Sequence, residues 1–237
     1  MKGHYIFAIG LLAIIACQND DAFLAEEQSS LEFYTSAEIV SRTSLQDGKT
    51  VVWNEGDAVA VYDYIAPKTK FIAAVEEGTA RFKGNITPKY AEFVAVYPYD
   101  LAADNNVNKS ILITLPSEQT AVKDGFGPNL NLSIGKGSRN VDGSPSEVRF
   151  RNICQLFRLS VPTYAANRIA KIELTANSVI AGQLTVDYSD YSPVVTTNEQ
   201  GAKTIALLPP SENTAFPEGA YYMVLAPKTV KGFTLTL

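Results

Sequence analysis

The chain has 237 residues and a formal net charge of −5 at pH 7. This acidic balance argues against a nucleic-acid partner, which would need a basic face. Hydrophobic residues make up 46% of the sequence, which is enough for a packed core and excludes a largely disordered chain, and the length allows one large or two small domains.

Residues 1–16 are typical of a signal peptide. Lys2 gives a positive start, and the uncharged run from Tyr5 to Ala16 is too short to span a bilayer comfortably. Cys17 follows at once, which resembles a bacterial lipobox, where the bond before the cysteine is cut and its thiol is acylated. We therefore expect cleavage between Ala16 and Cys17, an acyl chain such as palmitate on Cys17, and anchoring in the outer membrane. The alternative is a buried N-terminal helix that contains a cysteine.

Residues 17–42 are expected to form a tether or pro-segment, with one short strand candidate at Leu31–Tyr34. The tether begins with Gln18, Asn19, Asp20 and Asp21. Acidic residues in this place resemble the export signal that directs some Gram-negative lipoproteins to the cell surface. An ordinary solvated tether is the other interpretation.

Loss of the signal peptide removes the only histidine, His4, and leaves 19 basic and 25 acidic residues, a net charge of −6. Without histidine, Ser-His-Asp and Cys-His catalysis and histidine-ligated metal sites are excluded. Lipid on Cys17 leaves Cys154 without a disulfide partner, so Cys154 is expected to be a small buried hydrophobic residue. We expect no enzymatic activity, no cofactor and no metal.

Two acidic pairs could supply oxygen ligands to calcium, namely Asp100 with Asp104 and Asp187 with Asp190. Neither segment has the spacing of an ordered calcium loop, so solvated turn residues are the favoured interpretation.

From Lys49 onward, short runs rich in Val, Ile, Tyr, Phe and Thr alternate with turn residues, which is typical of β-strands. The expected strands of the first half are Lys49–Trp53, Ala58–Tyr62, Phe71–Val75, Ala80–Lys83, Ala91–Tyr97 and Ile111–Leu115. A hairpin loop is expected at Glu76–Thr79.

A long loop is expected from Lys123 to Pro145, interrupted by a strand at Leu130–Ile134. The next strand candidate, Glu147–Pro162, changes the phase of its apolar residues midway. A bulge near Asn152 explains the change, and a short helical turn at Ile153–Phe157 explains it equally well.

A second series of strands is expected after Pro162. Beyond the signal peptide, no window as long as a helix has apolar residues at the 3.6-residue spacing of a helix. Its members are Ile169–Leu174, Ala181–Val186, Thr204–Leu208, Ala220–Leu225 and Phe233–Leu237. The pattern predicts an all-β protein of two tandem β-sandwich domains, residues 43–164 and 165–237, of the immunoglobulin-like or transthyretin-like kind. Three interpretations of Phe233–Leu237 stay open: a fragment with an incomplete second domain, a strand that completes its own sheet, or a strand given to another subunit.

Several short sequence segments, taken in their order along the chain, resemble the fimbrillin family, particularly its Mfa-like branch. They are Arg42–Leu45, Val52–Val61, Ala95–Tyr99, Leu115–Gln119, Phe150–Cys154, Ile172–Asn177, Ala181–Gly182, Gly219–Tyr222 and Ala226–Pro227. The resemblance implies two transthyretin-like β-sandwich domains in a surface lipoprotein that serves as a stalk, anchor or tip subunit of a pilus, or as a related adhesin.

In stalk subunits of that family, an arginine-specific protease removes an N-terminal strand, and a strand of the next subunit then fills the vacant groove. Carried onto this chain, the resemblance makes Arg42 and Thr43 the candidate processing site, with an unprocessed, exposed arginine as the alternative. It also implies that Trp53 is a core residue. Expected partners are other pilus subunits or further copies of this chain, outer-membrane lipid, and a host protein or glycan.

A second function class is a monomeric surface lipoprotein that binds a glycan or host ligand. Tyr188 and Tyr191, if exposed, could stack on sugar rings or bind a partner protein.

Overall fold

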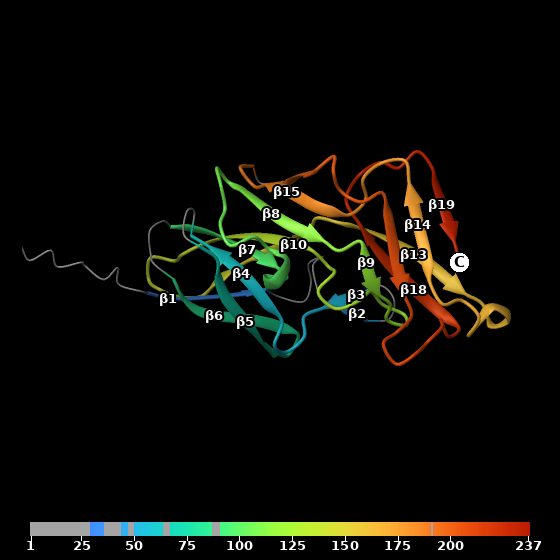
Figure 1. Cartoon of the computed structure of the whole chain (residues 1–237). Helices are drawn as coiled ribbons and strands as arrows, with labels where there is room; N and C mark the ends of the chain where they lie inside the picture. The colour runs from blue at the N-terminus through green and yellow to red at the C-terminus, as the bar shows by residue number, and fades with distance from the viewer. Residues whose placement is uncertain (1–28, 36–43, 47–49, 64–66, 87–90, 191) are drawn as a thin grey trace, which may run out of the picture.

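The computed structural model describes residues 29–35, 44–46, 50–63, 67–86, 91–190 and 192–237. In these residues the regular structure is β-strands and two short 3₁₀ turns, η1 (Tyr99–Leu101) and η2 (Thr163–Ala165). The prediction of an all-β protein is therefore confirmed, with several sheets in sandwich-like arrangements (Figure 1).

The largest sheet has eight strands in the order β11-β1-β6-β5-β4-β7-β10-β12. Its members are β1 (Ser29–Thr35), β4 (Ala58–Tyr62), β5 (Thr69–Glu76), β6 (Thr79–Ile86), β7 (Glu92–Tyr97), β10 (Ser133–Ser138), β11 (Ser146–Glu147) and β12 (Arg149–Asn152). The two end strands, β11 and β12, are separated along the chain by Val148 alone. The sheet therefore curls until its ends meet, which is the closure that defines a β-barrel.

Alternate residues of this sheet point inward and form an aromatic core together with Trp53 and Val148, which lie outside its strands. The buried members are Leu31, Phe33, Trp53, Val59, Val61, Phe71, Ala73, Ala80, Phe82, Ile86, Phe93, Ala95, Tyr97, Val148 and Phe150. The hairpin turn between β5 and β6 has Glu77 and Gly78 at φ values of 48° and 76°, the left-handed pair of a type I′ turn. The predicted hairpin at residues 76–79 is confirmed.

The outer face of β4 and β7 is buried as well, because a second core packs against it. Ala60, Tyr62, Val94 and Val96 belong to this second core. Burial on both faces explains why Val94 and Val96 are as apolar as Phe93 on the opposite face.

Three smaller sheets surround the second core: β13-β18, β19-β14-β17-β9 and β16-β15-β8. Their strands are β8 (Ser110–Leu115), β9 (Glu118–Thr120), β13 (Gln155–Val161), β14 (Ile172–Ala176), β15 (Gly182–Asp187), β16 (Val194–Thr197), β17 (Thr204–Leu208), β18 (Gly219–Leu225) and β19 (Phe233–Thr236). A separate short hairpin pairs β2 (Ser44–Gln46) with β3 (Thr50–Val52).

These sheets cross the predicted domain boundary at residue 164. The strands β8, β9 and β13 precede it, yet they pair with β15, β17 and β18 respectively, which follow it. Figure 1 shows green β8 beside orange β15, and green β9 beside the orange and red strands at the right. The division at residues 164 and 165 stays a prediction about the chain, while the sheets themselves are shared across that point.

Neither predicted explanation for the phase change in residues 147–162 holds. The strand is interrupted at Ile153 and Cys154, where the structure has neither a bulge within one ladder nor a helix. On one side β12 pairs with β10 of the barrel, and on the other β13 pairs with β18. The buried face changes because the chain leaves one sheet and enters another.

Candidate functional site

The first strand, β1, is held in the barrel by backbone pairing on both edges. All seven of its residues pair with β6, from Ser29 opposite Ile86 to Thr35 opposite Ala80. On its other edge only Phe33 and Tyr34 pair with β11, in parallel. We call this place between β6 and β11 the β1 position.

The β1 position is lined by aromatic rings, and Phe33 fills it. Phe33 is fully buried, and its ring centroid lies 5.8 Å from that of Phe71, 5.0 Å from that of Phe82 and 5.2 Å from that of Phe93. Leu31 and Thr35 on the same face of the strand are buried too. Loss of β1 would therefore expose an apolar row together with the unpaired backbone edge of β6.

Contacts on the outer face of β1 are weaker. Glu32 forms an ion pair with Arg81 of β6 at 3.6 Å, and the Arg81 guanidinium lies 5.8 Å from the ring centroid of Tyr34. Exposed pairs of this kind contribute little to stability. Affinity of the barrel for β1 thus resides in the backbone ladder and in the buried side chains.

The predicted processing residues Arg42 and Thr43 lie outside the described residues, as do Ala16 and Cys17. In the chain, Arg42 and Thr43 come after β1 ends at Thr35 and before β2 begins at Ser44. A cut there would separate β1 from the remainder of the barrel.

At the opposite end of the molecule, β19 lies at the edge of its sheet (Figure 1), where its ladder in the described part of the chain is with β14. Its side chains are exposed, with exposed fractions of 57% for Phe233 and 40% for Leu235. The sequence Phe-Thr-Leu-Thr-Leu from Phe233 to Leu237 places an apolar residue at every second position, which is the pattern with which β1 buries Leu31 and Phe33.

A groove of about 270 Å³ runs beside β19. It is lined by β13, β14, β18 and the segment before β19, with Leu156, Phe157, Leu174, Leu225, Val230 and Phe233 among its residues. Leu156 is 41% exposed, and the ring of Phe157 meets that of Phe233 edge to face at 5.4 Å. In the described part of the chain β13 has a ladder only with β18, so one of its edges is open.

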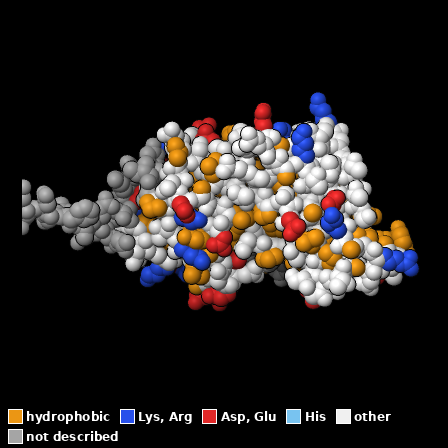
Figure 2. Space-filling model, in the orientation of Figure 1, with side chains coloured by type: hydrophobic (Ala, Val, Ile, Leu, Met, Phe, Trp, Pro, Cys, Tyr) orange, Lys and Arg blue, Asp and Glu red, His pale blue; other side chains and the backbone are white. Residues whose placement is uncertain are grey.

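On the face drawn in Figure 2, basic and acidic side chains are interspersed and neither sign gathers into one patch. Orange side chains gather at the right-hand end, where Figure 1 places the segment between β13 and β14. Tyr164 of that segment is 81% exposed.

The acidic pairs considered as calcium ligands make other contacts. Asp104 pairs with Lys68 at 3.4 Å. The Asp187 carboxylate accepts hydrogen bonds from the side chain and from the backbone N–H of Ser189, and these bonds hold the Asp187 pKa below its usual range. Among the described residues no group of three or more His, Cys, Asp or Glu side chains could hold a metal ion.

Tyr188 does not meet the condition of exposure under which it was considered for stacking on sugar rings. Tyr188 is buried, and its hydroxyl oxygen accepts a hydrogen bond of 2.9 Å from Nδ2 of Asn106. Asn106 belongs to the polar stretch near Asp104 that was considered for calcium. Tyr191 lies outside the described residues.

Trp53 occupies the core position that the resemblance implies. It is 7% exposed and meets Phe82, Tyr97 and Phe150 edge to face, with centroid separations between 5.0 and 5.3 Å. Cys154 is a free thiol, only partly exposed, and packs against the second core. Burial raises the Cys154 pKa to about 12, so the thiolate needed for nucleophilic chemistry is scarce at neutral pH.

Two polar arrangements in the interior are not apparent from the sequence. Asp63 is buried and pairs with Arg139 at 3.1 Å across 76 residues of chain. The Gln119 amide donates to the carbonyl oxygen of Val224 and accepts from its N–H, at 2.8 and 2.9 Å. Both contacts join segments far apart in sequence, so no local pattern indicated them.

No helix among the described residues is long and apolar enough to cross a membrane.

Comparison with known proteins gives one structural likeness. A crystal structure of a proposed cell adhesion protein from Bacteroides ovatus superposes on 88% of this chain and on 82% of its own chain, with a TM-score of 0.53 and 14% identity. At that identity the likeness shows a shared fold. No protein-family model matches the chain, and no curated protein matches it either.

Proposed function

We propose that this chain is a cell-surface adhesion protein that assembles by strand completion, as a fimbrillin-like subunit whose precursor is anchored through lipid on Cys17. Removal of residues 17–42 by a cut after Arg42 empties the β1 position, and a strand from a neighbouring subunit refills it. The role is structural and adhesive rather than enzymatic.

The single observation that carries the proposal is the way in which β1 is held. β1 is the first strand described, it precedes Arg42, and it fills an aromatic slot in the barrel with Phe33. Full burial of a large apolar side chain contributes roughly 1.5–3 kcal/mol. Loss of β1 would therefore lower the folding stability of the barrel by several kcal/mol. A donor strand with the same alternation of apolar residues restores this stability.

The strand β19 of another copy is the donor that we assign. Phe233, Leu235 and Leu237 alternate with threonines, and an inserted strand would direct this apolar row to the place that Leu31, Phe33 and Thr35 vacate. β19 has the exposed apolar side chains and the edge position that such a transfer needs. The adhesion role is in keeping with the adhesion assignment proposed for the Bacteroides ovatus protein, and the mechanism with the fimbrillin resemblance.

The proposal is tested by treating the purified chain with an arginine-specific protease. Size-exclusion chromatography and denaturing gels run without boiling then report assembly. We expect the product to begin at Thr43, to lose β1 and to form ladders that resist denaturant. Arg42→Ala should stay monomeric, while Arg168→Ala, at an exposed arginine elsewhere, should assemble like the parent chain. A chain cut before Thr43 that stays monomeric at high concentration would contradict the proposal.

A further inference from the structure

A cavity on the side of the barrel has a volume of about 680 Å³. Its walls come from β1, β4, β7, β10 and β11, together with Lys109, Tyr188 and Ser189. Small-molecule sites usually measure about 300–1,000 Å³, so this cavity has the size of a ligand site.

The cavity exists because two strands of the barrel separate beside it. The ladder between β10 and β12 ends with Lys136 opposite Arg149. Beyond it, Gly137 and Ser138 continue β10 along β7, whereas β11 turns to pair with β1. Gly137, Ser138 and Ser146 therefore face the same opening from its two sides.

The wall beside Tyr188 is held in place by hydrogen bonds. The Lys136 ammonium donates to the backbone oxygens of Ser189 at 3.4 Å and Asp190 at 2.7 Å. Tyr188 in turn accepts from Asn106.

The loop on the opposite side is fixed as well, because the Asn140 amide donates to the backbone oxygens of Ser144 and Pro145. Walls that are already ordered lose little conformational entropy when a ligand binds, so the cavity is preorganised.

The lining suits a ligand that carries many hydroxyl groups and no net charge. Glu92 and Glu147 bring two negative charges, and Lys109 and Lys136 bring two positive charges. The balance disfavours phosphates and other anions, which need excess positive charge. Carboxylates accept and ammonium groups donate hydrogen bonds, and the aromatic side chain of Tyr34 adds an amphipathic surface.

Ser146 is the clearest indication that something binds. The residue lines the cavity and is 9% exposed, and its buried Oγ has no hydrogen-bond partner among the described residues. A buried hydroxyl without a partner costs free energy. Rotation of the Ser146 side chain toward the cavity would let a ligand hydroxyl supply that partner.

We propose that this cavity binds a neutral saccharide, either free or at the end of a glycan. Assembly by strand completion is not needed for this binding, so the two proposals can fail separately.

Saturation-transfer NMR on the monomeric, uncut chain tests it, with glucose, galactose, N-acetylglucosamine, lactose and cellobiose as probes. Three variants test whether binding occurs in this cavity. Ser138→Trp fills the opening, and Ser211→Trp places the same bulk at an exposed site away from it. Ser146→Ala removes the hydroxyl that lacks a partner, which should leave the melting temperature unchanged or slightly higher.

We expect transfer to at least one probe in the parent chain and in Ser211→Trp, and its loss in Ser138→Trp. Ser146→Ala should weaken the dissociation constant of that probe about five- to tenfold, the usual effect of one hydrogen bond. Absence of transfer to every probe in the parent chain would overturn the proposal, and so would transfer that survives in Ser138→Trp.

Discussion

Phe33 is the residue whose side chain most directly fills the β1 position, since three phenylalanine rings of the barrel surround it. Replacing it by alanine removes the ring from a fully buried place. We expect Phe33→Ala to lower the free energy of unfolding of the uncut chain by about 3–5 kcal/mol, measured by urea denaturation.

Ile72→Ala on β5, which lies beyond β6 from β1 in the same sheet, is the matched control, because Ile72 is 54% exposed. Its effect should stay within about 0.5 kcal/mol. Equal effects for the two variants would mean that β1 is not packed as described.

Cys154 gives a prediction that depends on pH. Burial raises its pKa from 9.0 to about 12, so the folded thiol stays protonated where the unfolded thiol ionises. Between about pH 9 and 12 the unfolded state releases this proton and the folded state keeps it, so stability falls as pH rises through that interval.

Alkylation of Cys154 by iodoacetamide, followed by mass spectrometry, checks this prediction. Modification of the folded chain at pH 8 should be far slower than in guanidinium chloride, and it should accelerate about tenfold per pH unit up to pH 11. Equal rates at pH 8 in the folded and unfolded chain would show that the thiol is not shielded.

At the scale of elements, β10 requires glycine at position 137, where it pairs with Phe93 of β7. A Cβ atom added to Gly137 would lie 2.2 Å from Cζ of Phe93, whose ring is buried in the barrel core. Gly137→Ala should therefore destabilise the protein by about 1–3 kcal/mol. Gly232→Ala, where a Cβ meets nothing within 4 Å, is the control and should change the melting temperature by less than a degree or two. Equal melting temperatures for Gly137→Ala and Gly232→Ala would contradict the prediction.

Alternation of apolar and polar residues predicted most of the strands. Ala58–Tyr62 and Thr204–Leu208 coincide with β4 and β17, because one strand is buried on both faces and the other has a regular buried face. By contrast β10 begins at Ser133 rather than Leu130. It contains Gly135 and Gly137, and glycine is depleted in most strands.

The short strands β9 and β16 were not expected, and each has a physical reason. In β9, Gln119 is held through its side chain by β18, a contact that the sequence of β9 does not reveal. In β16, Val194–Thr197 pairs only with β15 in the described part of the chain and stays largely exposed, so it lacks a periodic apolar face.

At the scale of the whole molecule, one barrel wall is shared by two cores. Alternate residues of β4 and β7 face the aromatic core, and the residues between them face the second core. This sharing joins the two cores, and the smaller sheets around the second core combine strands from both sides of residue 164. Sequence patterns report which residues are apolar but not which core they enter, so this sharing could not be predicted from the sequence.

The candidate site was predictable in part. The strand candidate at Leu31–Tyr34 and the position of Arg42 were both apparent in the sequence, whereas the ring stacking around Phe33 requires the register of β1 against β6. The saccharide cavity was not predictable, because its walls come from strands distant in the chain and Tyr188 is buried.

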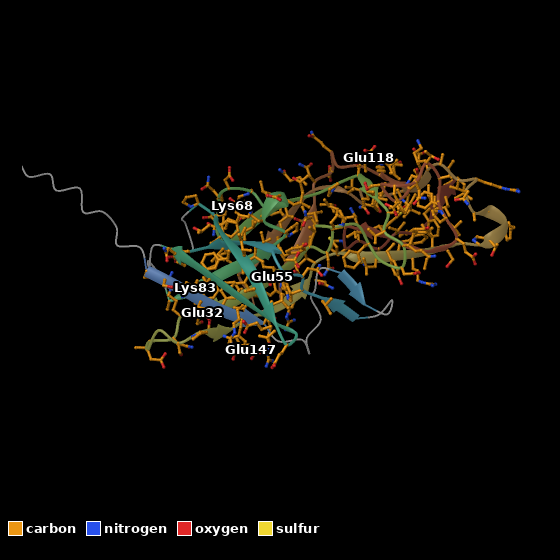
Figure 3. The ribbon with its side chains drawn as sticks, turned by 90° about the horizontal axis from the view of Figure 1, so that it is seen from below. Glu32, Glu55, Lys68, Lys83, Glu118 and Glu147 are labelled. Atoms are coloured by element: carbon orange, nitrogen blue, oxygen red, sulfur yellow. The ribbon has the colours of Figure 1, made fainter. Side chains whose placement is uncertain are left out.

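The central claim is that β1 must leave before subunits join, and a disulfide that locks β1 in place tests it most directly. Glu32 of β1 and Lys83 of β6 are register partners on neighbouring strands, as Figure 3 shows. Facing residues of an antiparallel pair have a Cα separation that a disulfide can span. The variant carries Glu32→Cys and Lys83→Cys in a chain that begins at residue 17 and carries Cys17→Ser and Cys154→Ala.

Its matched control carries Ile72→Cys with Lys83→Cys, a register pair that joins β5 to β6 and leaves β1 unbound. After the cut at Arg42, assembly is followed by size-exclusion chromatography with and without reductant. We predict that the oxidised lock stays monomeric and assembles on reduction, while the control assembles in both states. Assembly of the oxidised Glu32→Cys, Lys83→Cys variant as fast as that of its control would contradict strand exchange at the β1 position.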